Sequence, residues 1–115
     1  MADAILFIGW NRPHVGMDEK AMGYVTGDGL KYLKSVEGKY IERLEMIGLT
    51  AHGGDMNFAI ILHGSREKLD ELRRTDEFEA FSFKMASMLD RYGVVPGLGW
   101  EGIQKVMARM SSVQR

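Results

Sequence analysis

The chain has 115 residues, of which 45% are hydrophobic and 27% are charged, a composition typical of one folded domain. Fifteen lysines and arginines against sixteen aspartates and glutamates give a net charge of −1, so no basic surface for nucleic acid is expected. Cysteine is absent, which excludes disulfides, a thiolate nucleophile and cysteine-ligated metal sites. No segment resembles a signal peptide or a membrane span, so we expect a cytoplasmic protein without a membrane partner.

The first half of the chain predicts a strand, a helix and a second strand. Residues Ala4–Trp10 are almost continuously apolar, which predicts a strand buried on both faces. Apolar residues at helical spacing predict a helix over Met17–Val36, with a kink or break at Gly27–Gly29, because each glycine costs a helix about 1 kcal/mol relative to alanine. Residues Tyr40–Leu49 predict a strand whose charged residues favour a sheet edge or a partly wet face.

The next segments predict a hairpin and a long helix that changes direction. The turn cluster His52–Asp55 leads into a strand over Met56–His63, antiparallel to the preceding strand, with large apolar residues at its even positions. Ser65 is a predicted N-cap for the helix that follows. Thr75 resembles a second cap, so we expect a jog there before an apolar stripe of period three and four continues to Tyr92.

The chain is expected to end with an edge strand and a helix. Residues Gly93–Trp100 include a proline and three glycines, which suits a short strand at a sheet edge, and Ile103–Val113 predicts a short amphipathic helix. The order is β-α-β-β-α-β followed by that helix. We therefore predict one α+β domain over residues 1–115, with a ferredoxin-like four-stranded antiparallel sheet that carries both long helices on one face.

The second face of that sheet also needs a cover. The first strand is apolar on both faces, and Ala59 and Ile61 lie on the second face of the third strand. A ferredoxin-like sheet with an apolar free face resembles the dimeric α+β barrel superfamily, in which two such sheets stack. The chain further resembles a group of small uncharacterised bacterial proteins of this superfamily in four segments: Leu6–His14, His52–Asp55, Gly64–Arg74 and Gly93–Gly97. The resemblance implies a homodimer with no assigned reaction, and such an interface usually exceeds about 2,000 Å².

No cofactor or metal is expected. Haem-degrading members of the superfamily carry a histidine ligand on the second long helix, whereas residues 66–91 contain no histidine. His14, His52 and His63 show no ligand spacing typical of a metal site. The glycine clusters fit neither the phosphate-loop nor the dinucleotide motif.

Polar and titratable residues near strand ends are the candidates for a functional site. The ligand-binding candidates are Trp10, Arg12, His14, Tyr24 and Asn57, and the candidate general bases are His52 and His63. One hypothesis places Arg12 and the three histidines around a cavity between sheet and helices. The alternative is that the histidines are scattered loop and strand-end residues. Methionines could form soft walls of such a cavity, although they are more often core: Met22, Met46, Met56, Met85 and Met88.

Three functions remain open from the sequence. The first is a homodimer that binds a small, partly apolar molecule in a pocket on each subunit. The second is a cofactor-independent monooxygenase or isomerase in which His52 or His63 is the base and Arg12 stabilises an oxyanion. The third is a structural or regulatory dimer without a ligand site.

Overall fold

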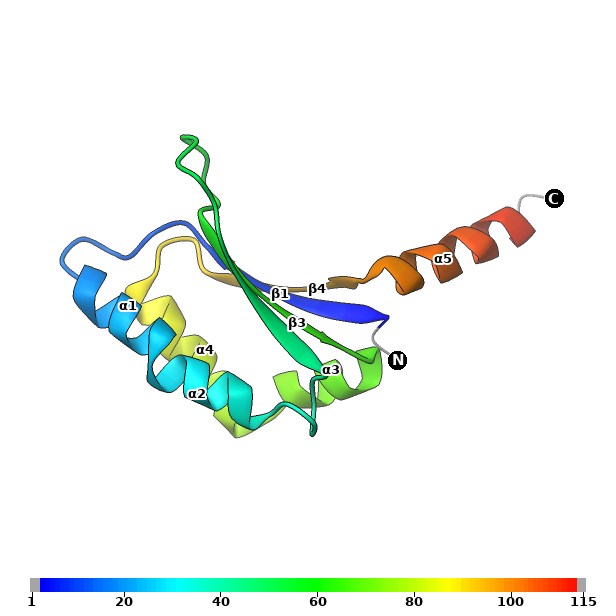
Figure 1. The fold of residues 1–115 in the computed structure, drawn as a ribbon, viewed down its shortest axis with the longest axis horizontal. Helices are drawn as coiled ribbons and strands as arrows, with labels where there is room; N and C mark the ends of the chain where they lie inside the picture. Colours follow the sequence, from blue (N-terminus) through cyan, green and yellow to red (C-terminus); the bar gives the residue numbers. More distant parts are fainter. Residues whose placement is uncertain (1–2, 114–115) are drawn as a thin grey trace.

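The computed structural model describes residues 3–113, and its elements follow the expected order. The strands are β1 (Ala4–Trp10), β2 (Arg43–Gly48), β3 (Phe58–Gly64) and β4 (Gly93–Leu98), and the helices are α1 (Asp18–Thr26), α2 (Asp28–Ser35), α3 (Arg66–Arg73), α4 (Asp76–Met88) and α5 (Trp100–Val113). The strands form one antiparallel sheet in the order β2-β3-β1-β4. Helices α1 to α4 lie on one side of this sheet (Figure 1). The predicted ferredoxin-like α+β fold is confirmed, including the edge positions of β2 and β4.

The break predicted in the first helix occurs at Gly27. This residue has φ −110° and ψ −107°, which are not helical values, so α1 ends before it and α2 starts after it. A Cβ atom at Gly27 would lie 2.5 Å from the carbonyl oxygen of Gly23. The break therefore depends on a residue without a side chain.

The jog in the second helical segment lies at Thr75 as predicted, and both predicted caps are formed. The Ser65 hydroxyl accepts a hydrogen bond from the Lys68 N–H, and the Thr75 hydroxyl accepts one from the Phe78 N–H, each at 3.2 Å. Two separately capped helices, α3 and α4, result. Helix α4 ends at Met88, so the expected helical stripe does not extend to Tyr92.

The two hairpin strands are shorter than the sequence pattern predicts. The N–H groups of Lys39, Tyr40 and Ile41 all donate to the Val36 carbonyl, which curls residues 36–41 into a turn and delays β2 to Arg43. Strand β3 starts at Phe58 rather than Met56. These corrections shift strand ends without changing which residues face which side.

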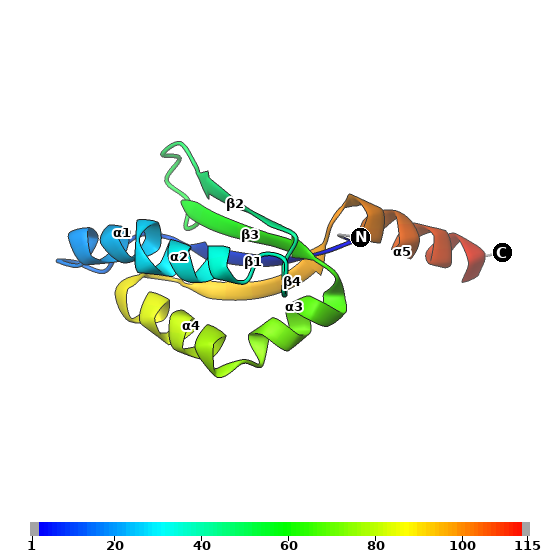
Figure 2. The same cartoon turned by 60° about the horizontal axis from the view of Figure 1, so that its bottom comes forward.

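The sheet has one buried face and one face that no described helix covers. On the helix side, the side chains pack into the core and are at most 1% exposed: Leu6, Ile8, Trp10, Ile60 and Leu62. The opposite face, called the open face below, carries Ile5, Phe7, Ile47, Ala59, Ile61, His63 and Val95. Ile5 and Phe7 are only half-buried there, so the expectation that β1 is buried on both faces is not met within a single chain. Figure 2 shows α1, α2 and α4 on the opposite side of the sheet from the open face.

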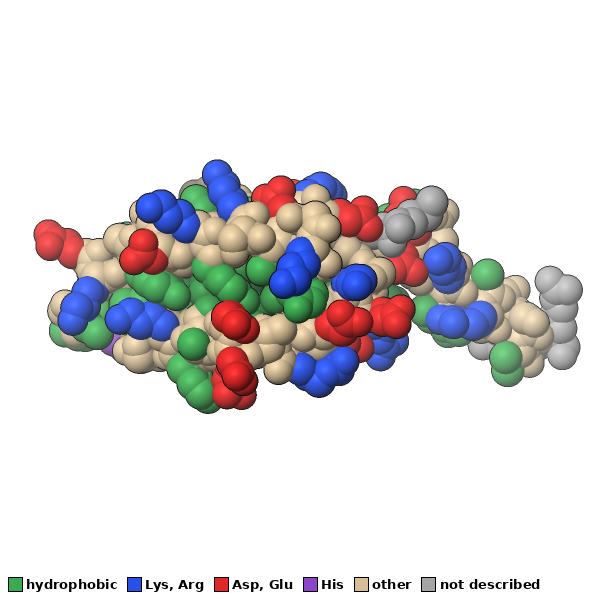
Figure 3. Space-filling model, turned by 90° about the horizontal axis from the view of Figure 1, so that it is seen from below, with side chains coloured by type: hydrophobic (Ala, Val, Ile, Leu, Met, Phe, Trp, Pro, Cys, Tyr) green, Lys and Arg blue, Asp and Glu red, His purple; other side chains and the backbone are tan. Residues whose placement is uncertain are grey.

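Helix α5 projects from one end of the molecule, which measures 56 × 34 × 19 Å (Figure 1). Its first turn packs on the chain start, because the Gly99 N–H donates to the Asp3 carbonyl and Gly102 lies against that same carbonyl. Seen from the helix side, hydrophobic side chains form a strip along the middle of the body, with charged residues on both sides, and α5 extends beyond it (Figure 3). None of the helices within residues 3–113 is both long and apolar enough to cross a membrane.

Candidate functional site

The residues that the sequence singles out lie at two ends of the sheet. At the Trp10 end, β1 finishes, β3 begins at Phe58, and the Asn57 N–H donates to the Trp10 carbonyl at 3.1 Å. His63 lies near the opposite end, where it pairs with Ile5. Five residue steps along an extended strand lead from Phe58 to His63, which corresponds to about 17 Å.

Trp10 lies beside an apolar pocket of about 200 Å³ at the Trp10 end. We call it the α1–β2 pocket, and its lining residues are Trp10, Met22, Val25, Met46, Ile47, Gly48, Phe58 and Ala59. The indole ring of Trp10 stacks on Phe58 with ring centroids 5.8 Å apart and planes inclined by 17°. Met22 and Met46 line this pocket, whereas Met85 and Met88 are core residues.

The Trp10 side chain carries an unpaired polar group beside this pocket. Trp10 is 1% exposed, and its Nε1–H has no hydrogen-bond partner within the described part of the chain. A buried donor without a partner costs about 1 to 3 kcal/mol. An acceptor could pair with this nitrogen only after the atoms that cover it had moved.

A chain of polar side chains closes the Trp10 end next to the pocket. The Asn57 side-chain amide donates to Asn11 Oδ1 at 2.5 Å, and the Asn11 amide donates to Asp90 Oδ2 at 3.2 Å. Arg91 pairs with Asp55 at 3.5 Å in the same region of the fold. Asn57 thus joins β3 to Asn11 after β1, and Asn11 joins that segment to Asp90 after α4. Neither link was predicted.

His52 is engaged within the β2–β3 loop. Its Nδ1 accepts a hydrogen bond from the Gly54 N–H at 3.1 Å, so Nε2 carries the hydrogen and donates to the Met56 carbonyl at 2.7 Å. Neither ring nitrogen then offers a free lone pair for proton abstraction. The ring instead fixes the conformation of the loop.

Arg12, His14 and Tyr24 do not join Trp10 in one pocket. Arg12 and His14 are exposed, and their backbone atoms make the hydrogen bonds: the Arg12 carbonyl accepts from the Asp90 N–H, and the His14 N–H donates to the carbonyl of Met88 at the end of α4. Tyr24 lies on α1 and packs against Phe81 with ring centroids 6.2 Å apart. Burial first, and the Asp28 carboxylate second, raise the pKa of Tyr24, which keeps its hydroxyl protonated at neutral pH.

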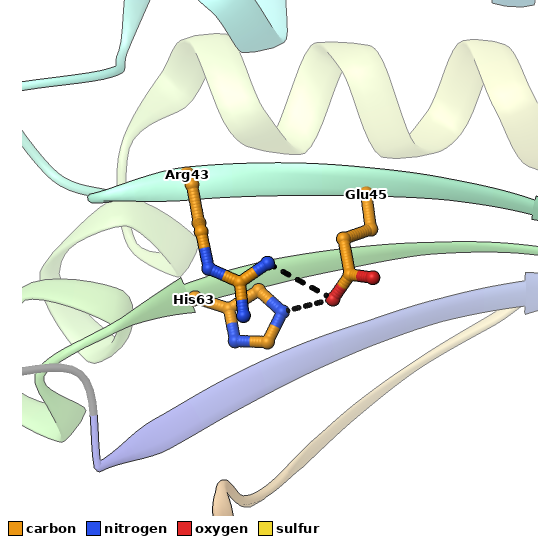
Figure 4. Close-up of polar contacts among 3 residues, drawn as sticks. All are labelled: Arg43, Glu45 and His63. Atoms are coloured by element: carbon orange, nitrogen blue, oxygen red, sulfur yellow. Dashed lines mark hydrogen bonds and ion pairs between the residues drawn. The ribbon is translucent and has the colours of Figure 1, made fainter.

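His63 forms a polar cluster with two β2 residues on the open face (Figure 4). Glu45 Oε1 lies 2.6 Å from His63 Nε2 and 3.2 Å from an Arg43 guanidinium nitrogen. The hydrogen bond from His63 is the main cause that lowers the pKa of Glu45. A carboxylate that orients an imidazole is an arrangement suited to a general base, but it lies far along the sheet from Trp10.

The predicted cavity containing Arg12 and all three histidines is not formed. The structure brings Trp10 together with Asn57 and the loop of His52, and it separates His63 from them. Within residues 3–113, no group of three or more His, Asp and Glu residues is placed to hold a metal ion. The pocket residues Val25, Ile47 and Phe58 were not predicted, because the β2–β3 register and the packing of α1 against the sheet bring them together.

Comparisons with known proteins identify the fold. No family model matches the chain, and no curated protein matches it. A solved structure from Bacteroides fragilis, described as a dimeric protein of unknown function and ferredoxin-like fold, covers 84% of this chain and 96% of its own, with 12% identity and a TM-score of 0.58. An ethyl tert-butyl ether d (EthD) family protein from Bacillus halodurans covers 83% of this chain and 96% of its own, also with 12% identity and with a TM-score of 0.64. The chain thus has the ferredoxin-like fold that is described for the Bacteroides fragilis protein.

Proposed function

We propose that the protein is a homodimer that binds a small, partly apolar molecule in the α1–β2 pocket of each subunit. The observation that carries this proposal is the buried Trp10 Nε1–H, which has no partner among the described residues and belongs to a residue that lines the pocket. An apolar pocket suits a ligand with an apolar body. A carbonyl or ether oxygen on that ligand would pair with the buried Trp10 N–H once the atoms that cover the nitrogen move aside.

The open face of the sheet supports the homodimer. Ile5, Phe7 and Ile61 lie on it half-buried, and Val95 is 57% exposed. Pairing two such faces would remove this apolar surface from water, which stabilises the pair by about 25 cal/mol for each Å² buried. A two-fold contact lets the patch on one subunit cover the same patch on the other. The description of the Bacteroides fragilis protein as dimeric also supports the proposal.

The two alternatives from the sequence receive less support. Catalysis that uses Arg12 with His52 as base is disfavoured because both nitrogens of His52 are engaged in its loop. The His63–Glu45 pair could orient a base, but it lies about 17 Å along β3 from Phe58. A dimer without a ligand site would leave the α1–β2 pocket and the Trp10 donor without a role.

A matched pair of probes tests the pocket. The chain has two tryptophans, so the Trp100→Phe variant leaves Trp10 as the only indole fluorophore. Titration with acetophenone and with α-methylstyrene, which replaces the carbonyl oxygen by a methylene, compares ligands of similar shape with and without the acceptor. We expect both to change Trp10 fluorescence and acetophenone to bind roughly two- to tenfold more tightly.

A variant on the pocket wall provides the control for location. Met22 lines the pocket from α1 and is 37% exposed, so Met22→Glu places a charge in the pocket while leaving the core intact. Phe83→Glu makes the same kind of change on α4, where the side chain is 68% exposed and outside the pocket. Binding should be lost in the first variant and kept in the second. Equal affinity for the two probes, or equal binding by the two variants, contradicts the proposed site.

A further inference from the structure

A second cleft lies at the other end of the sheet, between α3 and α5. It has a volume of about 240 Å³ and is called the α3–α5 cleft below. Leu6 and Pro96 contribute its floor from β1 and β4, and Leu69 and Val106 contribute apolar walls from the two helices. The lining is therefore apolar along most of its depth.

The rim of this cleft carries two guanidinium groups from different helices. Arg66 is the first residue of α3, Arg109 lies on α5, and both are exposed and without an ion pair within residues 3–113. Lys105, one turn before Arg109, is already engaged, because its Nζ lies 3.0 Å from Asp3 Oδ2. The two arginines thus remain available to an anion.

One carboxylate, that of Asp70, also lines the cleft. Together with the two arginines it leaves a lining of net charge +1. Asp70 also borders a shallow hollow with Arg73 and Arg74, but it forms no ion pair with either of these described residues. A lining with a net charge of +1 favours a ligand with a single negative charge over a dianion.

We propose that the α3–α5 cleft binds a small amphiphilic carboxylate, with its head group between Arg66 and Arg109 and its alkyl chain against Leu69 and Val106. Guanidinium groups bind carboxylates through paired, charge-assisted hydrogen bonds, and the apolar walls supply the contact for the chain. Because the two arginines belong to separate helices, the ligand would hold α5 against α3. Helix α5 otherwise packs on β4 and then projects from the body (Figure 1).

Titration of the full chain with sodium octanoate, followed by amide NMR, tests the proposal. The amide signals of Leu69 and Val106 should shift in a saturable manner, and octan-1-ol and acetate should bind at least tenfold more weakly because each lacks one half of the ligand. Shortening the carboxylate should weaken binding about fourfold per methylene. Octyl phosphate should bind no more tightly than octanoate at a pH where it is a dianion.

Charge-neutral variants locate the head group. Arg66→Gln and Arg109→Gln should each weaken octanoate binding about tenfold or more, whereas Arg73→Gln, on the same helix as Arg66 but outside the cleft, should leave it unchanged. All three side chains are exposed, so the variants should fold. The proposal would be overturned if octanol bound as tightly as octanoate, or if Arg73→Gln weakened binding as much as Arg109→Gln. It would also be overturned if octanoate did not bind because a second copy covers Val106. The readout lies at α3 and α5, so failure here is distinct from failure at Trp10.

Discussion

Phe7 and Ile61 are Cα partners in the antiparallel β1–β3 ladder, and both lie on the open face of the sheet. The Phe7 ring also lies over Gly9, since its Cε1 atom is 2.7 Å from where a Cβ of that residue would be. The centre of the open face is thus an apolar surface over the two middle strands. This surface is the part of the molecule that a second copy would cover.

Neighbouring residues of β3 offer a direct test of that role. Ile61 is half-buried on the open face, whereas Leu62 is fully buried under the helices. Ile61→Asp should give a folded monomer, because the charge is tolerated by a single chain but not between two sheets. Leu62→Asp should unfold the chain. Sedimentation and circular dichroism distinguish these results, and a dimeric Ile61→Asp protein would show that the open face is not the interface.

The pKa of Glu45 should depend on His63 more than on Arg43. The hydrogen bond from His63 Nε2 is the largest cause of its lowered pKa, and the Arg43 charge is a smaller one. Since the folded pKa is depressed below 4.5, the pair stabilises the fold above the unfolded pKa, and this contribution is lost as the pH falls through the folded value. Carboxylate NMR should show that the pKa of Glu45 rises more in His63→Ala than in Arg43→Ala. The reverse order would contradict the geometry of Figure 4.

Tyr92 should make stability fall at alkaline pH. Burial raises its pKa from 10.0 to about 12, while the hydrogen bond with Ser82, 3.0 Å long, opposes the rise. A raised folded pKa means that the stabilisation is fully present below about pH 10 and is lost as the pH rises towards 12. Two pH units correspond to about 3 kcal/mol as an upper figure. Urea unfolding at several alkaline pH values should show this slope, and Tyr92→Phe should remove most of it.

Two glycines in helices should respond oppositely to alanine. A Cβ at Gly102 would collide with the Asp3 carbonyl oxygen, whereas a Cβ at Gly23 in α1 meets nothing within 4 Å. Gly102→Ala should displace the first turn of α5 and speed hydrogen exchange of its amides. Gly23→Ala should stabilise the protein by roughly 0.5 to 1 kcal/mol. Unchanged exchange in Gly102→Ala would mean that α5 is not anchored at residue 3.

Local sequence signals predicted most of the fold. The glycine break at Gly27 and the caps at Ser65 and Thr75 act within one or two helical turns, so each could be recognised from neighbouring residues. The predicted ends of the strands were less accurate, because the turn that delays β2 depends on hydrogen bonds from three N–H groups to the single carbonyl of Val36. No local pattern in the sequence predicts these three hydrogen bonds.

The functional site was predictable only in part. Trp10 and Asn57 were among the predicted site residues, and they meet at one end of the sheet as expected for strand ends. The pairing of His63 with Glu45, and the separation of His63 from His52, depend on the β2–β3 register and on a loop whose length could not be read from the alternation of residues. That the Trp10 N–H has no hydrogen-bond partner could not be predicted, because it depends on the positions of the side chains around it.

Native mass spectrometry of the protein purified from its own cells tests the central claim most directly, because it reports the subunit number and a retained ligand together. The proposed function predicts a dimer that carries a discrete added mass for each subunit, and this mass should be absent from Met22→Glu and retained by Phe83→Glu. A monomer, or an added mass that remains in Met22→Glu, would contradict a homodimer that binds its ligand beside Trp10.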